Sequence, residues 1–368
     1  MKHILRQGAL TLVFLGLLYG LCLGISLLVV PPPKQTGVLD TAEAEDSLFM
    51  TPTKYVVLNR TALANPEKRV LLLGASNTAV GFPQQQMQSQ VPCAAVNNLS
   101  IGDANISEVT QMIDLVHEMQ DGATRQSDVF VIGIWYGMFV DNTARWHDTQ
   151  RIPGDTDIDV ERYRYGFYRR TNAGPVAVWP PDRLELGVLL IRPYLLLERV
   201  VRDATHGLRD ALFVRAPHPT EAEREARVVS DDDKSDALAY WQKNMEASGG
   251  VSQAQFNLLE SEVRTLVNSG ERVVLVDLPL PAWHRQASPY YIPFKTDEKA
   301  MLDHLSGLSG FTFLQMDDFD AETDFSDEVH PKPHAVPIWT GRLAAVLNPV
   351  VCSAAPVSAA GEHSEITR

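Results

Sequence analysis

The sequence predicts an α/β fold built on a doubly wound, mainly parallel five-stranded sheet. Short apolar runs alternate with longer segments in which apolar residues recur at helical spacing. The runs are apolar at almost every position, which is typical of strands buried on both faces of a parallel sheet. With 368 residues, of which 45% are hydrophobic, the chain is long enough for one large domain with additional segments.

The N-terminus predicts a membrane anchor over residues 1–33. Two basic residues precede residues 9–30, which are almost wholly apolar and long enough as a helix to cross about 30 Å of hydrocarbon. No small-residue cleavage motif follows, and three consecutive prolines end the segment. We therefore favour an uncleaved single-pass anchor, with the rest of the chain exported, over a cleaved signal peptide. Residues 34–66, rich in Thr, Ala, Pro and acidic residues, are expected to form a stalk or a loosely packed lead-in to the domain.

The domain proper is expected over residues 67–348. Its predicted strands cover residues 69–73, 94–99, 128–135, 272–278 and 311–315. Its predicted helices cover residues 105–119, 251–268, 296–308 and 334–347. The remaining residues, 349–368, are rich in Ala and Ser and are expected to be disordered.

A long insertion, residues 137–250, separates the third and fourth predicted strands. A crossover needs only about a dozen residues, so this segment must form structure of its own. It is expected to be mostly helical, with an apolar-faced helix over 184–208 and a charged, solvated part over 221–246. A cluster of Arg and aromatic residues between positions 145 and 170 either binds acidic sugars or packs as a salt-bridged surface.

Charge and cysteine content narrow the functional classes. The formal net charge of −14 argues against a nucleic-acid-binding protein, because neutralising phosphates needs clustered Lys and Arg. Cys22 falls in the predicted anchor, whereas Cys93 and Cys352 would be exported and either form a disulfide or stay free. No ligand spacing indicates a metal site, and we expect no cofactor.

Two short motifs, far apart in the chain, supply the residue types of a serine acyl-transfer site. Ser76 follows the first predicted strand, and Asp327 and His330 lie three positions apart after the fifth. A serine hydroxyl needs an imidazole to take its proton, and the imidazole needs a carboxylate to orient it. Both motifs follow strands of one parallel sheet, so we expect them to meet at its carboxyl edge. Asp324 and His334 are the nearby alternatives for the carboxylate and the base.

These motifs resemble the SGNH (GDSL-like) hydrolase superfamily over about residues 67–137 and 270–347. The matching blocks are Gly74-Ala75-Ser76, Asn97 to Asp103, and Asp327 to His330. The resemblance implies that the backbone N–H groups of Ser76 and Gly102 stabilise the oxyanion. The family's third block supplies an Asn donor, but here the strand end reads Gly133-Ile134-Trp135-Tyr136-Gly137. Asn98 and Asn142 are the candidates for the missing side-chain donor.

Three further residues are candidates for the substrate pocket because they follow predicted strands. Tyr136 follows the third strand, and Trp283 and His284 follow the fourth. A core aromatic residue is the alternative for Tyr136. All three would lie near the carboxyl edge of the sheet, where ligands bind in this class of fold.

The layout resembles that of membrane-anchored SGNH components of bacterial cell-surface polysaccharide O-acylation systems. The resemblance implies a location in the bacterial inner membrane, with the catalytic domain in the periplasm or extracytoplasmic space. It also implies a role in moving acyl groups, with acetyl expected, on an exopolysaccharide or another acyl ester, beside a polytopic membrane acyltransferase. An exported esterase or lipase and a catalytically silent biosynthetic scaffold are the alternatives, since the superfamily holds several activities.

Overall fold

The computed structural model describes residues 2–29, 38–64, 67–120, 125, 128–141, 156–171, 174–180, 183–212 and 219–352. Its centre is an all-parallel five-stranded sheet with the strand order β2-β1-β3-β6-β7. The strands are β1 (Arg69–Leu73), β2 (Ala95–Asn98), β3 (Asp128–Ile134), β6 (Arg272–Asp277) and β7 (Phe311–Gln315). The sequence-based strands are confirmed, each to within one residue at either end. Strands β1 and β3 are buried at every position: their apolar runs predict this burial, and their charged first residues, Arg69 and Asp128, pair with each other.

Helices cover both faces of this sheet. On one face α5 (Ile106–His117), α11 (Gln253–Asn268) and α13 (Tyr291–Leu305) pack in a row, and on the other α14 (Val336–Val351) packs against α3 (Ser76–Gly81) and α4 (Gln84–Gln90). The crossover from β1 to β2 moves across the sheet in one direction, and the later crossovers move in the other. Because crossovers between parallel strands are right-handed, helices in connections of opposite direction lie on opposite faces. The strand order therefore reverses between β1 and β3, and in open α/β sheets such a reversal marks the ligand site.

The predicted stalk is wrong over the residues that the structure describes there. Residues 38–64 form η1 (Thr41–Glu43), α2 (Pro52–Asn59) and η2 (Arg60–Ala64), and they pack against the domain. Leu39, Tyr55 and Val56 are almost completely buried, and the N–H of Leu39 donates to Asn97 Oδ1 at 2.8 Å. The apolar residues of this segment fall mainly in two short runs, 48–50 and 55–58, within a stretch rich in Thr, Ala and acidic residues, so composition alone did not indicate their burial.

The insertion is mostly helical, as predicted, with one addition. It contains α7 (Asp157–Arg164), α8 (Leu184–Leu212), α9 (Glu221–Ala226) and α10 (Asp231–Ala247). The addition is an antiparallel pair of short strands, β4 (Tyr168–Thr171) and β5 (Gly174–Ala177). Arg162 and the Tyr168 hydroxyl both bind the carboxylate of Glu118, so the described part of the Arg and aromatic cluster forms a packed, salt-bridged surface. Residues 142–155, including Asn142, lie outside the described residues.

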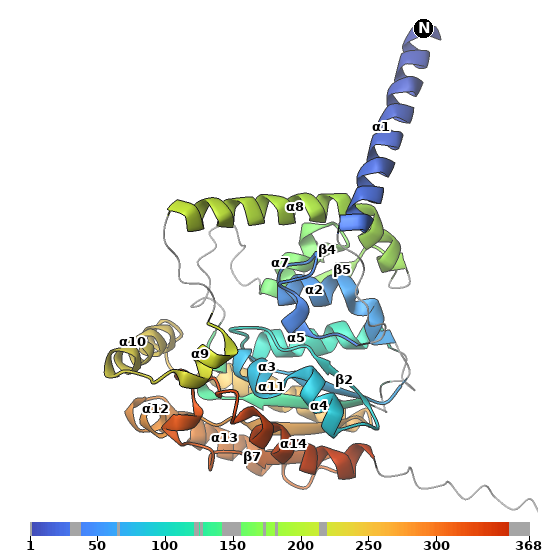
Figure 1. Cartoon of the computed structure of the whole chain (residues 1–368). Coiled ribbons are helices and arrows are strands. Elements are labelled where there is room, and N and C mark those ends of the chain that lie inside the picture. Colours follow the sequence, from blue (N-terminus) through green and yellow to red (C-terminus); the bar gives the residue numbers. More distant parts are fainter. Residues whose placement is uncertain are drawn as a thin grey trace, which may run out of the picture.

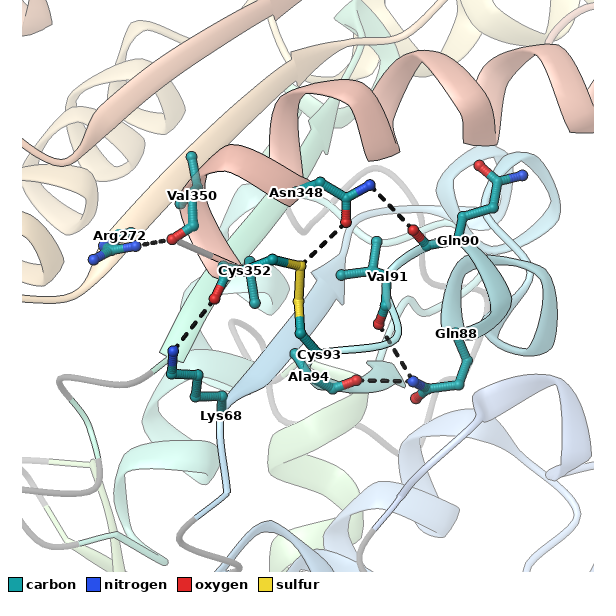
Figure 2. The surroundings of a disulfide bond; sticks show 11 residues. Lys68, Gln88, Gln90, Val91, Cys93, Ala94, Arg272, Asn348, Val350 and Cys352 are labelled. Carbon is teal, nitrogen blue, oxygen red and sulfur yellow. Dashed lines mark hydrogen bonds between the residues drawn. A yellow bond between two sulfur atoms is a disulfide. The ribbon is translucent and has the colours of Figure 1, made fainter. Parts of the chain in front are cut away.

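Two features stand at the chain ends. Helix α1 (Lys2–Val29) is long and apolar enough to cross a membrane and projects away from the rest of the molecule (Figure 1). At the other end, Cys93 and Cys352 form a disulfide whose Cα atoms lie 5.6 Å apart (Figure 2). Residues 349–351 belong to α14, so the expected disordered tail begins too early, and residues 353–368 lie outside the described residues.

Candidate active site

Ser76 stands at the carboxyl edge of the sheet because β1 turns sharply into α3. Gly74 makes this turn with a φ of 150°, a value that favours glycine. A Cβ on Gly74 would lie 2.1 Å from Thr78 Oγ1 and 2.9 Å from the Gly133 carbonyl oxygen. The glycine of the Gly-x-Ser motif is therefore required for the packing of α3 over β1 and β3. Ser76 is the first residue of α3, so its N–H has no acceptor within the helix.

Three side chains form one continuous hydrogen-bonded chain. Asp327 Oδ2 lies 2.8 Å from His330 Nδ1, and His330 Nε2 lies 2.8 Å from Ser76 Oγ. Asp327 Oδ1 also accepts the N–H groups of Val329 and His330, at 3.0 and 2.8 Å, which fixes the carboxylate in the loop. With Nδ1–H donating to the carboxylate, Nε2 is free to accept the proton of the serine hydroxyl.

The two nearby alternatives do not join this chain. His334 Nδ1 lies 2.5 Å from Glu225 Oε1, and its Nε2 lies 3.2 Å from Asp324 Oδ1. Its imidazole is 44% exposed and bridges α9 to the loop after β7. Asp324 and His334 therefore form a separate surface pair.

Burial and pairing act in opposite directions on the two titrating groups. Burial raises the pKa of Asp327, but the hydrogen bond and charge of His330 and the two backbone N–H groups outweigh it, and the pKa is lowered. Burial lowers the pKa of His330, but its hydrogen bond to Asp327 and that carboxylate's charge outweigh it, and the pKa is raised. The negative charges of Glu328 and Asp103 act in the same direction on His330. The pair thus favours an ionised carboxylate beside a readily protonated imidazole.

Ser76 opens into a cleft of about 750 Å³. Gly102 lines this cleft and is exposed, and a Cβ placed on it would meet no atom within 4 Å. The opposite wall comes from residues 40–52, from Arg202 of α8 and from Glu221 and Arg224 of α9. The cleft is therefore bounded both by the sheet edge and by the segments that the sequence interpretation placed outside the domain core.

Asn98 does not take the predicted role of oxyanion donor. Its side chain is fully buried, its Nδ2 donates to the Ala79 carbonyl at 3.4 Å, and its Oδ1 accepts the N–H of Ser100 at 3.2 Å. These bonds tie β2 to α3 and to the following turn, and Asn98 does not line the cleft. Sequence reasoning missed Ser100, which lines the cleft and whose buried Oγ has no hydrogen-bond partner within the described part of the chain.

The three predicted pocket residues do not line the cleft but lie behind the loop that carries Asp327 and His330. Tyr136 and His284 are fully buried, with Tyr136 Oη 2.5 Å from His284 Nε2. His284 Nδ1 lies 2.8 Å from the carbonyl oxygen of Glu328, so Nδ1–H donates there and Nε2 accepts from the tyrosine. Burial lowers the pKa of His284 to about 4, which keeps this imidazole neutral. Trp283 stacks on His284 at a centroid distance of 5.2 Å.

The prediction that Tyr136, Trp283 and His284 line the substrate pocket is therefore wrong, and Tyr136 and His284 instead support the loop that carries Asp327 and His330. Glu328 lies between Asp327 and His330, so the Tyr136–His284 pair holds the backbone of the loop that carries both. The three residues follow their strands as predicted, but the side chains of Tyr136 and His284 point into the core, and Trp283 is partly buried beside them.

Comparison with known proteins gives no match, either among family models or among curated proteins. The resemblance to SGNH hydrolases therefore rests on the sequence motifs alone. Within the described ranges, no group of three or more His, Cys, Asp and Glu side chains is arranged to hold a metal ion. Chemically, the site offers a hydroxyl, a base and an orienting carboxylate at the mouth of a cleft.

Proposed function

We propose that the protein is a membrane-anchored serine acyl-transfer enzyme, an SGNH-type ester hydrolase or O-acyltransferase. The observation that carries the proposal is the continuous chain from Asp327 through His330 to Ser76, with both connecting distances at 2.8 Å. Ser76 lies far in the sequence from Asp327 and His330, and it lines an open cleft.

The geometry supports a two-step mechanism through an acyl-enzyme. Ser76 Oγ attacks the acyl carbonyl carbon while its proton passes to His330 Nε2, and Asp327 stabilises the imidazolium that forms. The carbonyl oxygen becomes an oxyanion, for which the N–H groups of Ser76 and Gly102 are the proposed donors. The C–O bond of the ester then breaks, and His330 returns the proton to the departing alkoxide. In the second step His330 deprotonates water or a sugar hydroxyl, which attacks the acyl-enzyme and restores Ser76.

We further propose an exported site that acts on O-acyl groups, with acetyl expected, of a bacterial cell-surface polysaccharide. Helix α1 supplies the anchor, and its apolar length supports a single span of the inner membrane. The Cys93–Cys352 disulfide supports an oxidising compartment such as the periplasm. An enzyme in that place needs an acyl donor, and a polytopic membrane acyltransferase is the proposed partner that delivers it.

The acyl-enzyme is tested with full-length protein in detergent, using a fluorescent fluorophosphonate and an aryl acetate. Wild type should be labelled and should hydrolyse the ester, and Ser76→Ala should do neither. Ser89→Ala is the matched control, because Ser89 is an exposed serine of α4 that only bonds the Gln86 carbonyl. Wild type that behaves like Ser76→Ala in both assays would show that the covalent mechanism is wrong.

A simple exported esterase is the second candidate, and the solvent access of the site favours it. The His330 and Asp327 side chains are 26% and 27% exposed, so water can reach the triad. The two activities differ in the acceptor that takes the acyl group. Adding an oligosaccharide to the aryl acetate assay separates them, because a transferase forms acylated sugar whereas an esterase releases only acetate.

A further inference from the structure

The long helix of the insertion, α8, has an apolar face that the rest of the described protein does not cover. Its exposed apolar residues recur at intervals of three and four positions, which places them in one stripe along the helix. They are Leu186, Leu189, Leu190, Tyr194, Leu197, Val200, Val201 and Leu208. Leu197 is 58% exposed and Leu208 is 63% exposed, so the stripe continues over most of the helix. We call these eight residues the α8 stripe.

The opposite face of α8 holds the helix on the domain through polar contacts. Glu198 accepts from Lys54 Nζ at 2.9 Å, and Arg202 donates to the Met50 carbonyl at 2.9 Å. Arg199 donates to the Asp46 carbonyl at 2.7 Å. These contacts fix the rotation of the helix about its axis, so the α8 stripe faces away from the domain. A soluble surface rarely exposes a continuous apolar strip of this length.

Helix α1 extends from the side of α8 that faces away from the domain (Figure 1). It crosses α8 and rises from it, while the rest of the molecule lies on the other side of α8 (Figure 1). The two helices are joined by Arg192 of α8, which donates to the Ser26 carbonyl at 3.4 Å in a buried contact. The corner between them is an apolar cavity of about 730 Å³, lined by residues such as Leu18 and Cys22 of α1 and Tyr194 and Leu197 of α8.

The length of α1 sets the level of the bilayer. A span needs about 20 apolar residues, and the last charged residue before the span is Arg6. Counting from there, the hydrocarbon ends near Ser26, which is the residue that contacts α8. A bilayer that surrounds α1 to this depth also reaches the α8 stripe.

We propose that α8 is an interfacial helix that lies in the surface of the bilayer crossed by α1, with the α8 stripe among the lipid acyl chains. An amphipathic helix in this position buries its apolar face about 5–10 Å into the headgroup and acyl boundary. The occupant is lipid because the α8 stripe is continuous with the lipid-facing surface of α1 through the apolar corner. This inference rests on the proposed anchoring by α1 but not on the proposed chemistry.

The test places a fluorescent probe on single cysteines of the full chain in phosphatidylcholine nanodiscs. Leu197→Cys and Val201→Cys mark the α8 stripe, each in a Cys22→Ala background, and the Cys93–Cys352 pair stays oxidised. Asp203→Cys is the matched control, because its side chain is 65% exposed on the same helix but lies outside the stripe. We expect doxyl-labelled lipid to quench most of the emission at 197 and 201, with iodide as the effective quencher at 203.

A separate probe on native Cys22 reports the anchor itself. Quenching of Cys22 by doxyl lipid, together with iodide access at 197 and 201, would overturn the interfacial position of α8 and leave the anchor intact. Protection of those two sites only after native membrane proteins are added would equally overturn it and assign the α8 stripe to a protein partner. Failure of lipid quenching at Cys22 would instead remove the anchoring on which the inference rests.

Discussion

The disulfide between Cys93 and Cys352 makes a quantitative prediction about stability. Replacing both cysteines by alanine removes a cross-link that closes a loop with a sequence separation of 259. For a loop of this size the chain-entropy model gives a loss of about 5 kcal/mol in the free energy of unfolding. The loss acts through the unfolded state, which gains conformational freedom when the cross-link is absent.

The folded geometry should survive the change, because other contacts hold the end of α14. Asn348 Nδ2 donates to the Gln90 carbonyl at 3.2 Å, Lys68 Nζ donates to the Val351 carbonyl at 3.4 Å, and Arg272 binds the Val350 carbonyl (Figure 2). The measured difference should therefore report the cross-link itself. At about 2 °C per kcal/mol for a domain of this size, the double variant should unfold about 10 °C below wild type.

The assay is thermal unfolding of full-length protein in detergent, followed by tryptophan fluorescence. Cys22→Ala serves as the control, because Cys22 is a free thiol exposed on α1 and should leave the unfolding temperature unchanged. Reductant should lower the unfolding temperature of wild type and should not affect the double variant. Three titratable thiols in unreduced, denatured wild type, or an unfolding temperature insensitive to both changes, would refute the disulfide.

Four further predictions follow from single residues. Gly74→Ala should lower the free energy of unfolding by about 1–3 kcal/mol in chemical denaturation, because a Cβ there meets Thr78 Oγ1 and the φ is unfavourable for alanine. An unchanged free energy of unfolding would contradict the described packing of Gly74. Tyr136→Phe should cost about 1–3 kcal/mol by leaving buried His284 Nε2 without a donor, and it should lower kcat without moving the pH profile. Asp103→Asn should lower the pKa of His330, because it removes a nearby negative charge. Esterase activity falls at acidic pH when His330 becomes protonated, so this fall should move to lower pH in the variant. Ser100→Ala should leave unfolding unchanged, because its hydroxyl has no partner in the described chain, but should lower kcat by about 100-fold if that hydroxyl stabilises the oxyanion.

The sheet and the triad could be predicted because their signals are local. The run Arg69–Leu73 is long and apolar enough to identify a buried strand, and the spacing of Asp327 and His330 matches a loop that pairs a carboxylate with an imidazole. The parallel sheet then converts sequence order into spatial proximity, since the ends of β1 and β7 share an edge. The proximity of Ser76 and His330 therefore followed from the predicted sheet and needed no separate long-range prediction.

The rest depends on burial, which a single sequence does not report. Tyr136 and His284 follow their strands as predicted, but whether such a side chain turns to the cleft or to the core is decided by packing. Residues 38–64 carry most of their large apolar side chains in two runs of only three and four residues, so the composition resembled a stalk although the segment packs against the domain. Asn98 was misassigned for the related reason that its amide is used by neighbouring backbone groups.

Helix α8 connects the two halves of the functional proposal. Its outward face carries the α8 stripe, whereas Arg202 on its inward face lines the cleft beside Ser76 and donates to the Met50 carbonyl. If α8 lies in the bilayer surface, the cleft wall formed by residues 40–52 is fixed at a constant height above the membrane. Under the proposed function, a cleft at that height would suit an acyl donor delivered by an enzyme within the same membrane. The proposed position of α8 would then place the anchor, the insertion and the cleft wall on one continuous surface.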